Sequence, residues 1–400
     1  MRPGHVAAVS LVAAALGGAL VLAVAKAAGW LGSGKQTTQV VRVQGDAGEP
    51  SPVVVAKPLA GNGFSPAQVY RRRSAGVVTI FSLFSSNGAP DASAGQGSGF
   101  VVGRDGTILT SAHVITNAGQ GPGGAAPAHA VFVEFPDGDR TQARIVGYDL
   151  FDDVGVIRVD PGAHALSPVP LGNSSRVVVG QPVAAIGSPF GNVDSLSVGV
   201  VSAVHRSIPS LTTNYDLVDA IQTDAPINHG NSGGPLFDAR GRVIGINAQI
   251  RSTGDTSGFE GVGFAVPIDS AKRSLQQLES SGKVRYAYVG ITTEDLTPSI
   301  AKKFGYAATR GALIDAFAEG NPAGKRAGLK AATRLEVFQG ESVHVGGDAI
   351  VAIAGIPVRS AEDVVRIVAE RLVPGETATF TVVRGGRRLA VPVKLDERPD

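Results

Sequence analysis

The chain has 400 residues, a formal net charge of +2 and 43% hydrophobic residues. Its length suits two domains of average size, and its composition is that of a folded chain rather than a disordered one. The near-neutral charge gives no reason to expect a nucleic-acid partner, and a sequence without cysteine excludes disulfides, thiolate catalysis and cysteine-ligated metals.

The first apolar segment, Val6 to Ala25, is 20 residues long and carries no charge. At about 1.5 Å per residue, such a helix is roughly 30 Å long, which is the thickness of a bilayer core. A cleavable signal has a shorter apolar part of about 7–15 residues, although Ala23-Val24-Ala25 has the small residues of a cleavage site. We expect residues 1–29 to form a single-pass membrane anchor, with cleavage left open, and residues 30–63 to form a flexible linker.

A short helix is expected from Pro66, with Ser65 as its N-cap. Two series of six short strand patterns follow, separated by turn residues. The first series comprises residues 77–81, 99–102, 107–110, 131–135, 144–148 and 154–159, and the second comprises residues 182–186, 195–204, 217–222, 235–237, 242–247 and 263–266. They predict a mostly β domain of two six-stranded barrels over residues 64–281. The Gly/Ala-rich segments 85–97 and 118–129 are expected to be mobile loops.

The pattern changes after a helix expected over residues 269–280. Mixed α and β signals predict a separate, smaller α+β domain over residues 282–397. Its clearest helix runs from Ala361 to Leu372, because Ser360 is a good N-cap and Pro374-Gly375 stops the helix.

The turn Gly230-Asn231-Ser232-Gly233-Gly234-Pro235 carries the sharpest chemical signal. A serine hydroxyl becomes a good nucleophile when a base takes its proton and backbone N–H groups receive the developing oxyanion. The amides of Gly230 and Ser232 are the natural donors for such an oxyanion hole. By itself, however, the hexapeptide could be an ordinary Ser/Gly turn.

The same turn could also be the nucleophile elbow of an α/β-hydrolase. That elbow requires a helix after the serine and a histidine later in the chain. Here Pro235 and a strand pattern follow, and the later histidine, His344, lies in a Gly-rich segment predicted to be a loop. The elbow interpretation is therefore excluded, and the base is expected upstream.

His113 is the candidate base, because it follows the apolar strand pattern that ends at Thr110. An isolated histidine is usually structural, so the pairing with Ser232 is what singles it out. His129 and His164 fall in predicted loops, and His205 ends a strand pattern with no acidic pattern nearby. His229 is too close to Ser232 on the tight turn to reach its hydroxyl and is expected at the edge of a pocket.

Asp153 is the candidate acid that orients the imidazole, because it opens the apolar run that ends at Val159. Its neighbour Asp152 is the rival. Alternation along a strand places the two side chains on opposite faces, so one of them can point at His113, and Asp152 fits better as a solvated turn residue.

Five segments in this order resemble the HtrA (Deg) family of trypsin-like serine proteases: Gly97–Phe100, Thr110–Val114, Asp153–Val156, Gln222–Asp224 with Gly230–Pro235, and Gly263–Pro267. The resemblance implies a chymotrypsin-like double β-barrel, the triad His113, Asp153 and Ser232, no cofactor, and a homotrimer. Three residues depart from the family pattern, namely Gly155, Pro226 and His229.

The specificity pocket is expected to be modest and apolar. A pocket selective for basic residues would need an acid near Pro226, and none is there. The expected lining is Ile227, Asn228, Ile246, Asn247 and Ala248, which would favour small or medium aliphatic residues.

The C-terminal domain resembles a PDZ domain. Tyr288-Val289-Gly290-Ile291 is similar to the loop whose amides hold a peptide carboxylate while the peptide adds a strand. Between Leu329 and Gly347 the chain carries extra residues where many such domains have a short link.

These features predict an ATP-independent serine endopeptidase that acts on misfolded or signalling proteins at the outer face of a membrane, because the sequence has no phosphate-binding loop for a nucleotide. The alternative is a peptide-sensing chaperone or scaffold with an idle or latched protease domain. The expected partners are unfolded or C-terminally exposed polypeptides and the membrane. High use of Ala, Gly and Arg indicates a GC-rich bacterial genome.

Overall fold

The computed structural model describes residues 64–86, 89–118, 125–187, 195–213, 215–228, 230–248 and 261–399. The predicted membrane anchor and linker, residues 1–29 and 30–63, lie outside these residues. Among the helices that are described, none combines the length and the apolar character needed to cross a bilayer.

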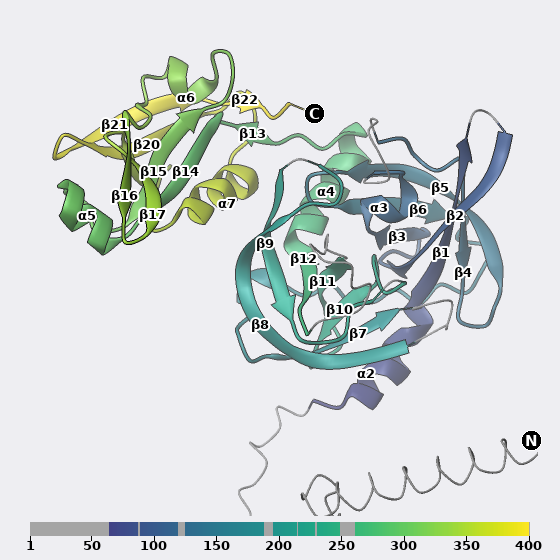
Figure 1. Ribbon diagram of the computed structural model, residues 1–400. Helices are drawn as coiled ribbons and strands as arrows, with labels where there is room; N and C mark the ends of the chain where they lie inside the picture. Colours follow the sequence, from purple (N-terminus) through teal and green to yellow (C-terminus); the bar gives the residue numbers. More distant parts are fainter. Residues whose placement is uncertain are drawn as a thin grey trace, which may run out of the picture. The chain divides into compact units, whose positions relative to one another are not determined.

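The first barrel follows helix α2 (Pro66–Arg73) and a 3-10 turn, η1 (Ser74–Gly76) (Figure 1). It is a closed antiparallel barrel in the order β1-β2-β3-β6-β5-β4. Its strands are β1 (Val77–Ser86), β2 (Ala89–Val101), β3 (Thr107–Thr110), β4 (Ala130–Glu134), β5 (Arg140–Asp149) and β6 (Val154–Val159). A one-turn helix, α3 (Ala112–Ile115), follows β3 directly.

The second barrel is also closed, in the order β10-β11-β12-β9-β8-β7. A 3-10 turn, η2 (Ser174–Arg176), precedes it. Its strands are β7 (Pro182–Gly187), β8 (Ser195–Pro209), β9 (Asp216–Thr223), β10 (Pro235–Asp238), β11 (Val243–Ala248) and β12 (Gly263–Pro267). The prediction of two six-stranded barrels is confirmed.

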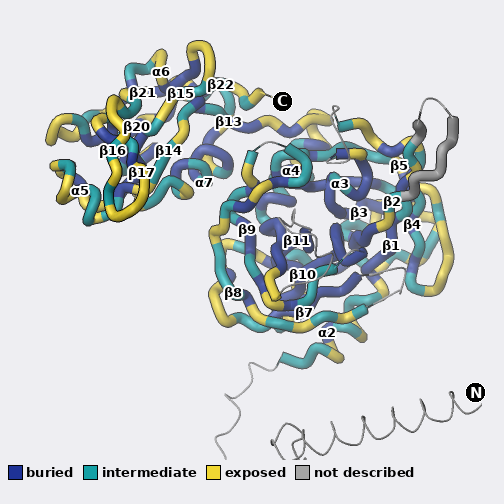
Figure 2. The backbone as a smooth tube through the Cα atoms, viewed as in Figure 1, coloured by how far each residue is buried: buried dark blue, intermediate teal, exposed yellow. Residues whose placement is uncertain are grey.

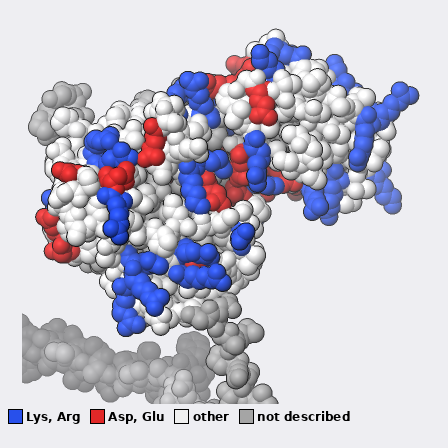
Figure 3. All heavy atoms as spheres, turned by 180° about the vertical axis from the view of Figure 1, so that it is seen from behind, with Lys and Arg blue, Asp and Glu red and all other residues white. Residues whose placement is uncertain are grey.

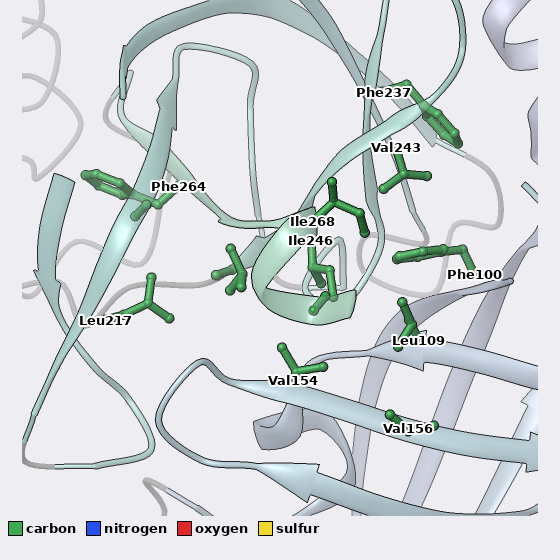
Figure 4. Close-up of a cluster of buried hydrophobic side chains, with 14 of the residues drawn as sticks. Phe100, Leu109, Val154, Val156, Leu217, Phe237, Val243, Ile246, Phe264 and Ile268 are labelled. Atoms are coloured by element: carbon green, nitrogen blue, oxygen red, sulfur yellow. The ribbon is translucent and has the colours of Figure 1, made fainter. Parts of the chain in front are cut away.

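A hydrophobic core joins the two barrels. Phe100, Leu109 and Val154 from the first barrel pack in one cluster with Phe237 and Ile246 from the second (Figure 4). Each of these five side chains has no exposed surface. Burying such a side chain stabilises a fold by about 1.5–3 kcal/mol, so the segments that leave the strands at this interface are held on a rigid base.

Helix α4 (Ile268–Ser281) packs its apolar face against both barrels and ends at Gly282, which adopts the left-handed conformation that closes a helix. Its residues Ile268, Ala271 and Leu278 belong to the shared core. The buried strands of the barrels and of the domain that follows are dark in Figure 2.

The C-terminal domain contains a six-stranded antiparallel sheet, in which β14, β15, β18, β20 and β21 follow one another and β19 pairs with β18. These are β14 (Ile291–Leu296), β15 (Gly311–Phe317), β18 (Ala349–Ile353), β19 (Ile356–Pro357), β20 (Thr377–Arg384) and β21 (Arg387–Lys394). A two-stranded ladder pairs β13 (Ala287–Tyr288) with β22 (Asp396–Glu397). The helices are α5 (Pro298–Phe304), α6 (Ala323–Arg326) and α7 (Ala361–Arg371), and Ser360 caps α7 as predicted by accepting a bond from Asp363 N.

Three local expectations are wrong. Segment 85–97 was expected to be a loop, but its described residues fall in β1 and β2, which form one long antiparallel hairpin. His344 was placed in a loop, but it lies on β17 (Glu341–Val345), which pairs with β16 (Arg334–Phe338); this hairpin is made by the extra residues after Leu329. Ser65 occupies the N-cap of α2, yet its side chain makes no capping bond.

Charge on the surface is mixed. On the face drawn in Figure 3, basic and acidic side chains lie beside one another, which agrees with a net charge of +2.

Candidate active site

His113 and Asp153 meet at the edge of the first barrel that faces the shared core. His113 lies on α3, and Asp153 ends the turn between β5 and β6. His113 Nδ1 is 2.7 Å from Asp153 Oδ2, and the backbone N–H of His113 donates to Asp153 Oδ1 at 3.0 Å. The carboxylate thus holds both the ring and the backbone of His113, which leaves Nε2 as the ring nitrogen that can accept a proton.

The surroundings of His113 favour the protonated form of its imidazole ring. Burial opposes the charged form of His113, but the negative charge of Asp153 and its hydrogen bond outweigh burial and raise the pKa of His113 above 6.5. Only 14% of the His113 side chain and 6% of the Asp153 side chain are exposed. A buried carboxylate beside an imidazole stabilises the imidazolium that forms when the ring takes a proton.

Asp153 has an unusual backbone. Its φ is +50°, in the left-handed region that is uncommon for residues other than glycine. Its C=O accepts a hydrogen bond from Ala112 N at 3.1 Å, so the turn and α3 are linked through both main chain and side chain. Asp152 turns the other way, and its Oδ2 lies 3.4 Å from Arg273 Nη2. The expectation that Asp152 is solvated is wrong, because it is 4% exposed.

Ser232 lies in the tight turn between β9 and β10. Its C=O accepts a hydrogen bond from Ser98 N at 2.8 Å, and Ser98 Oγ donates to the C=O of Gly230 at 2.5 Å. Because Ser98 lies on β2, the first barrel holds the serine turn of the second barrel at two carbonyls. Sequence reasoning noted Ser98 only as part of a family motif and assigned it no role.

Two glycines allow this turn. Gly230 has a φ of +97° and Gly233 a φ of +83°. A Cβ at position 233 would lie 2.3 Å from both Ser98 O and Thr110 Oγ1, so the turn packs directly against the strand that leads to His113. Any side chain there would push the serine turn away from His113.

The backbone N–H groups of the serine turn fall into two sets. Those of Asn231, Gly233 and Gly234 donate to the C=O groups of residues 228, 247 and 231. Within the described part of the chain, the N–H groups of Gly230 and Ser232 donate to no backbone acceptor. The oxyanion hole predicted at these two amides remains a prediction.

The residues predicted for the specificity pocket differ in their burial. Ile227 and Asn228 are half-buried, whereas Ile246, Asn247 and Ala248 are buried. Ile246 and Ala248 belong to the shared core. Asn247 Nδ2 donates to Pro235 O at 3.2 Å. The pocket itself remains a prediction.

Several other histidines are paired with acids. His164 Nε2 lies 3.0 Å from Asp137 Oδ2. His205 bonds Asp219 across β8 and β9, and this acid lies 14 residues further along the chain, outside any local acidic pattern. His229 lies outside the described residues.

One group among the described residues has three potential metal-ligand atoms within 4.8 Å of one another, namely Glu294, Asp315 and His344 in the C-terminal domain. The hydrogen bond that His344 makes to the carboxylate of Glu294, with the charges of Glu294 and Asp315, raises the pKa of His344. These contacts are accounted for by an ion-pair cluster that holds β17 against β14 and β15.

The predicted peptide-binding loop, Tyr288 to Ile291, leads into β14. Gly290 has a φ of +70°, and its C=O accepts a bond from Ala318 N at 3.0 Å. Among the described strands, β14 pairs with β15 alone and is the end strand of the sheet, with α7 packed beside it. An edge strand next to a helix can accept an added peptide strand.

Comparisons with known proteins agree with this geometry. Residues 97–246 match the profile of the trypsin-like peptidase domain. A probable periplasmic serine endoprotease, DegP-like, from Hahella chejuensis is 37% identical over 78% of this chain and 59% of its own length. Protease Do-like 1, chloroplastic, from Arabidopsis thaliana is 38% identical over 76% of this chain and 64% of its own length. The chain thus spans about three-fifths of the length of these curated relatives.

Solved structures are also similar. The HtrA-type protease AlgW with tripeptide is 30% identical, with a TM-score of 0.67, and the match covers 84% of this chain and 98% of that chain. The serine endoprotease from Yersinia pestis is 28% identical, with a TM-score of 0.56. These solved structures therefore resemble this chain in amino-acid sequence as well as in fold.

Replacing Asp153 with asparagine removes the charge that raises the pKa of His113 and leaves the burial that lowers it. We expect the His113 titration midpoint, followed by NMR of imidazole-labelled protein, to fall in Asp153→Asn. Asp152→Asn is the matched control, because Asp152 faces Arg273, and should leave the midpoint close to its wild-type value. Equal shifts in the two variants would contradict the assigned pairing.

Proposed function

This chain belongs to the HtrA family of trypsin-like serine endoproteases, and from that membership we propose that it is an ATP-independent serine endopeptidase acting on unfolded or misfolded proteins outside the cytoplasm. The observation that carries the proposal is the contact of 2.7 Å between His113 Nδ1 and Asp153 Oδ2, together with the Ser98 bonds that bring the Ser232 turn to the same edge.

The proposed mechanism uses three side chains and two amides. His113 Nε2 takes the proton of Ser232 Oγ as the oxygen attacks the scissile carbonyl carbon, and the amides of Gly230 and Ser232 stabilise the oxyanion. The imidazolium then gives its proton to the leaving amine, which leaves an acyl-enzyme ester. In the second half, His113 Nε2 takes a proton from a water molecule as its oxygen attacks the acyl carbon. The imidazolium then returns this proton to Ser232 Oγ as the ester bond breaks and the carboxylic acid product leaves. Asp153 fixes the tautomer with the proton on Nδ1 throughout.

The alternative is a peptide-sensing chaperone or scaffold with an idle or latched protease domain, and one observation is compatible with it. Ser232 Oγ is buried and has no hydrogen-bond partner among the described residues. Catalytic hydrogen bonds are often long or absent in a free enzyme and tighten with substrate, so this observation fits a resting protease equally well.

We also propose the membrane anchor at residues 1–29, the PDZ function of residues 282–397 and a homotrimeric assembly. The membrane anchor is supported by the apolar run Val6 to Ala25. An extracytoplasmic catalytic domain is supported by relatives that are described as periplasmic. The PDZ function is supported by the edge strand β14 beside α7 and by the similar structures of the HtrA-type protease AlgW with a tripeptide and with a decapeptide. The trimer rests on family membership alone.

The function is tested by incubating the full chain, wild type and Ser232→Ala, with an unfolded protein and identifying the products by mass spectrometry. We expect cleavage by the wild type and a loss on the order of 10⁶-fold in Ser232→Ala, because removing the nucleophile of such a triad leaves only binding and oxyanion stabilisation. The cut sites should follow small or medium aliphatic residues. Equal cleavage by both proteins would rule out Ser232, and no cleavage by either would favour the scaffold.

Peptide recognition is tested with a fluorescent peptide that ends in aliphatic residues. We expect it to bind when its C-terminal carboxylate is free and to lose affinity by at least about tenfold when that carboxylate is amidated, because the loop amides at residues 288–291 would then lose a charged acceptor. Binding is followed by fluorescence polarisation on Ser232→Ala, which cannot degrade the probe. Equal affinity for both peptides would contradict a PDZ-type carboxylate site.

A further inference from the structure

Asp149 is a buried carboxylate that accepts four hydrogen bonds but touches neither His113 nor Ser232 in any described contact. It is the last residue of β5 and is 2% exposed. Its Oδ1 accepts the backbone N–H groups of Phe151 at 3.0 Å and of Asp152 at 3.3 Å. Both donors belong to the turn that ends at Asp153, so the carboxylate fixes the residue immediately before the proposed catalytic aspartate.

The other oxygen of Asp149 reaches outside the barrel. Oδ2 accepts the hydroxyl of Ser274 on α4 at 2.6 Å and the hydroxyl of Tyr286, which lies between α4 and β13. One carboxylate therefore ties together the β5–β6 turn, the helix across the barrels and the segment that leads into the C-terminal domain.

The charge state of this network suits strong hydrogen bonds. Burial and the nearby carboxylate of Asp152 raise the pKa of Asp149 to about 6, and all four of its hydrogen bonds come from donors, as an ionised carboxylate requires. Burial and the charges of Asp149 and Asp152 raise the pKa of Tyr286 well above 10, so its hydroxyl keeps the proton that it donates. Hydrogen bonds to an ionised acceptor are roughly twice as strong as neutral ones.

An aromatic cluster with a cation at its centre closes over the same turn. Phe151 packs edge-on against Tyr286 and Tyr215, with ring centroids 5.3 and 5.6 Å apart. The guanidinium of Arg398 lies 5.1 to 5.4 Å from the centroids of these three rings. Arg398 also donates its backbone N–H to Tyr286 O at 2.9 Å. The ring of Tyr286 is thus held in place while its hydroxyl reaches Asp149.

The turn needs this support, because Asp153 adopts a left-handed φ of +50°, a conformation that persists only when its surroundings hold it. We propose that Asp149 is a positioning residue for the proposed protease reaction, holding Asp153 in register with His113, and that Tyr286 is the donor through which the C-terminal segment contributes to this alignment. The inference rests on the proposed function but makes a separate structural claim about the resting protein.

The test compares Asp149→Asn and Tyr286→Phe with two matched controls in the full chain. Asp238→Asn alters another strand-end aspartate, 3% exposed, whose carboxylate accepts the N–H groups of Arg240 and Arg242 in the β10–β11 turn. Tyr306→Phe removes another tyrosine hydroxyl, which accepts a bond from Gly346 N in the C-terminal domain. Each control makes the same substitution as its test variant at a residue whose described hydrogen bonds do not involve the turn before Asp153.

Two readouts separate positioning from stability. We expect kcat for a peptide substrate to fall on the order of 10–100-fold in Asp149→Asn with KM nearly unchanged, as misplacement of a catalytic group does, and to fall severalfold in Tyr286→Phe. The downfield NMR signal of the His113 Nδ1 proton, assigned by its absence in His113→Gln, should shift or disappear in both variants. Both controls should keep the wild-type kcat and signal.

The outcomes are distinguishable. Wild-type kcat and an unchanged Nδ1 signal in Asp149→Asn and Tyr286→Phe would overturn the proposal. If Asp149→Asn does not fold, Tyr286→Phe alone tests the proposal, because this substitution removes a single oxygen atom and keeps the aromatic ring. If the wild type cleaves nothing, the proposed function fails, and the Nδ1 signal in the resting protein still decides whether Asp149 positions Asp153.

Discussion

The contact between His113 Nδ1 and Asp153 Oδ2, 2.7 Å long, depends on two segments that leave different strands of one barrel. His113 follows β3, and Asp153 precedes β6, which pairs with β3 in the closed barrel. Strand pairing therefore brings the two segments to the same edge, and the left-handed backbone of Asp153 turns its carboxylate toward the ring. Everything proposed for the chemistry of this chain requires that this edge stays rigid.

Rigidity comes from the core that the two barrels share. Phe100 lies two residues after Ser98, Leu109 lies four residues before His113, and neither side chain has any exposed surface. The same core holds Phe237, which follows the Ser232 turn on β10. Ser98 then joins the barrels by hydrogen bonds to the C=O groups of Ser232 and Gly230. Because a packed interior transmits small displacements, a change in the core should reach the serine turn.

Much of this architecture could be predicted from the sequence, because short β-patterns and turn residues mark twelve strands and because Ser232, His113 and Asp153 stand in recognisable settings. The ends of β1 and β2 could not, since a Gly/Ala-rich segment has no alternating pattern and joins the hairpin only through pairing along the barrel. Asp152 was misjudged for a related reason, because its partner Arg273 lies 121 residues away and comes close only in the folded chain. The pairing of His205 with Asp219, 14 residues away, likewise leaves no local pattern in the sequence.

The proposed chemistry depends on Ser232 being a nucleophile that His113 activates. A fluorophosphonate, which reacts with activated serines, tests this directly when it is added to the intact chain and the adduct is located by mass spectrometry. We expect one adduct, on Ser232, whose formation slows by orders of magnitude in His113→Ala. An adduct on another serine, or equal labelling of Ser232 with and without His113, would contradict it.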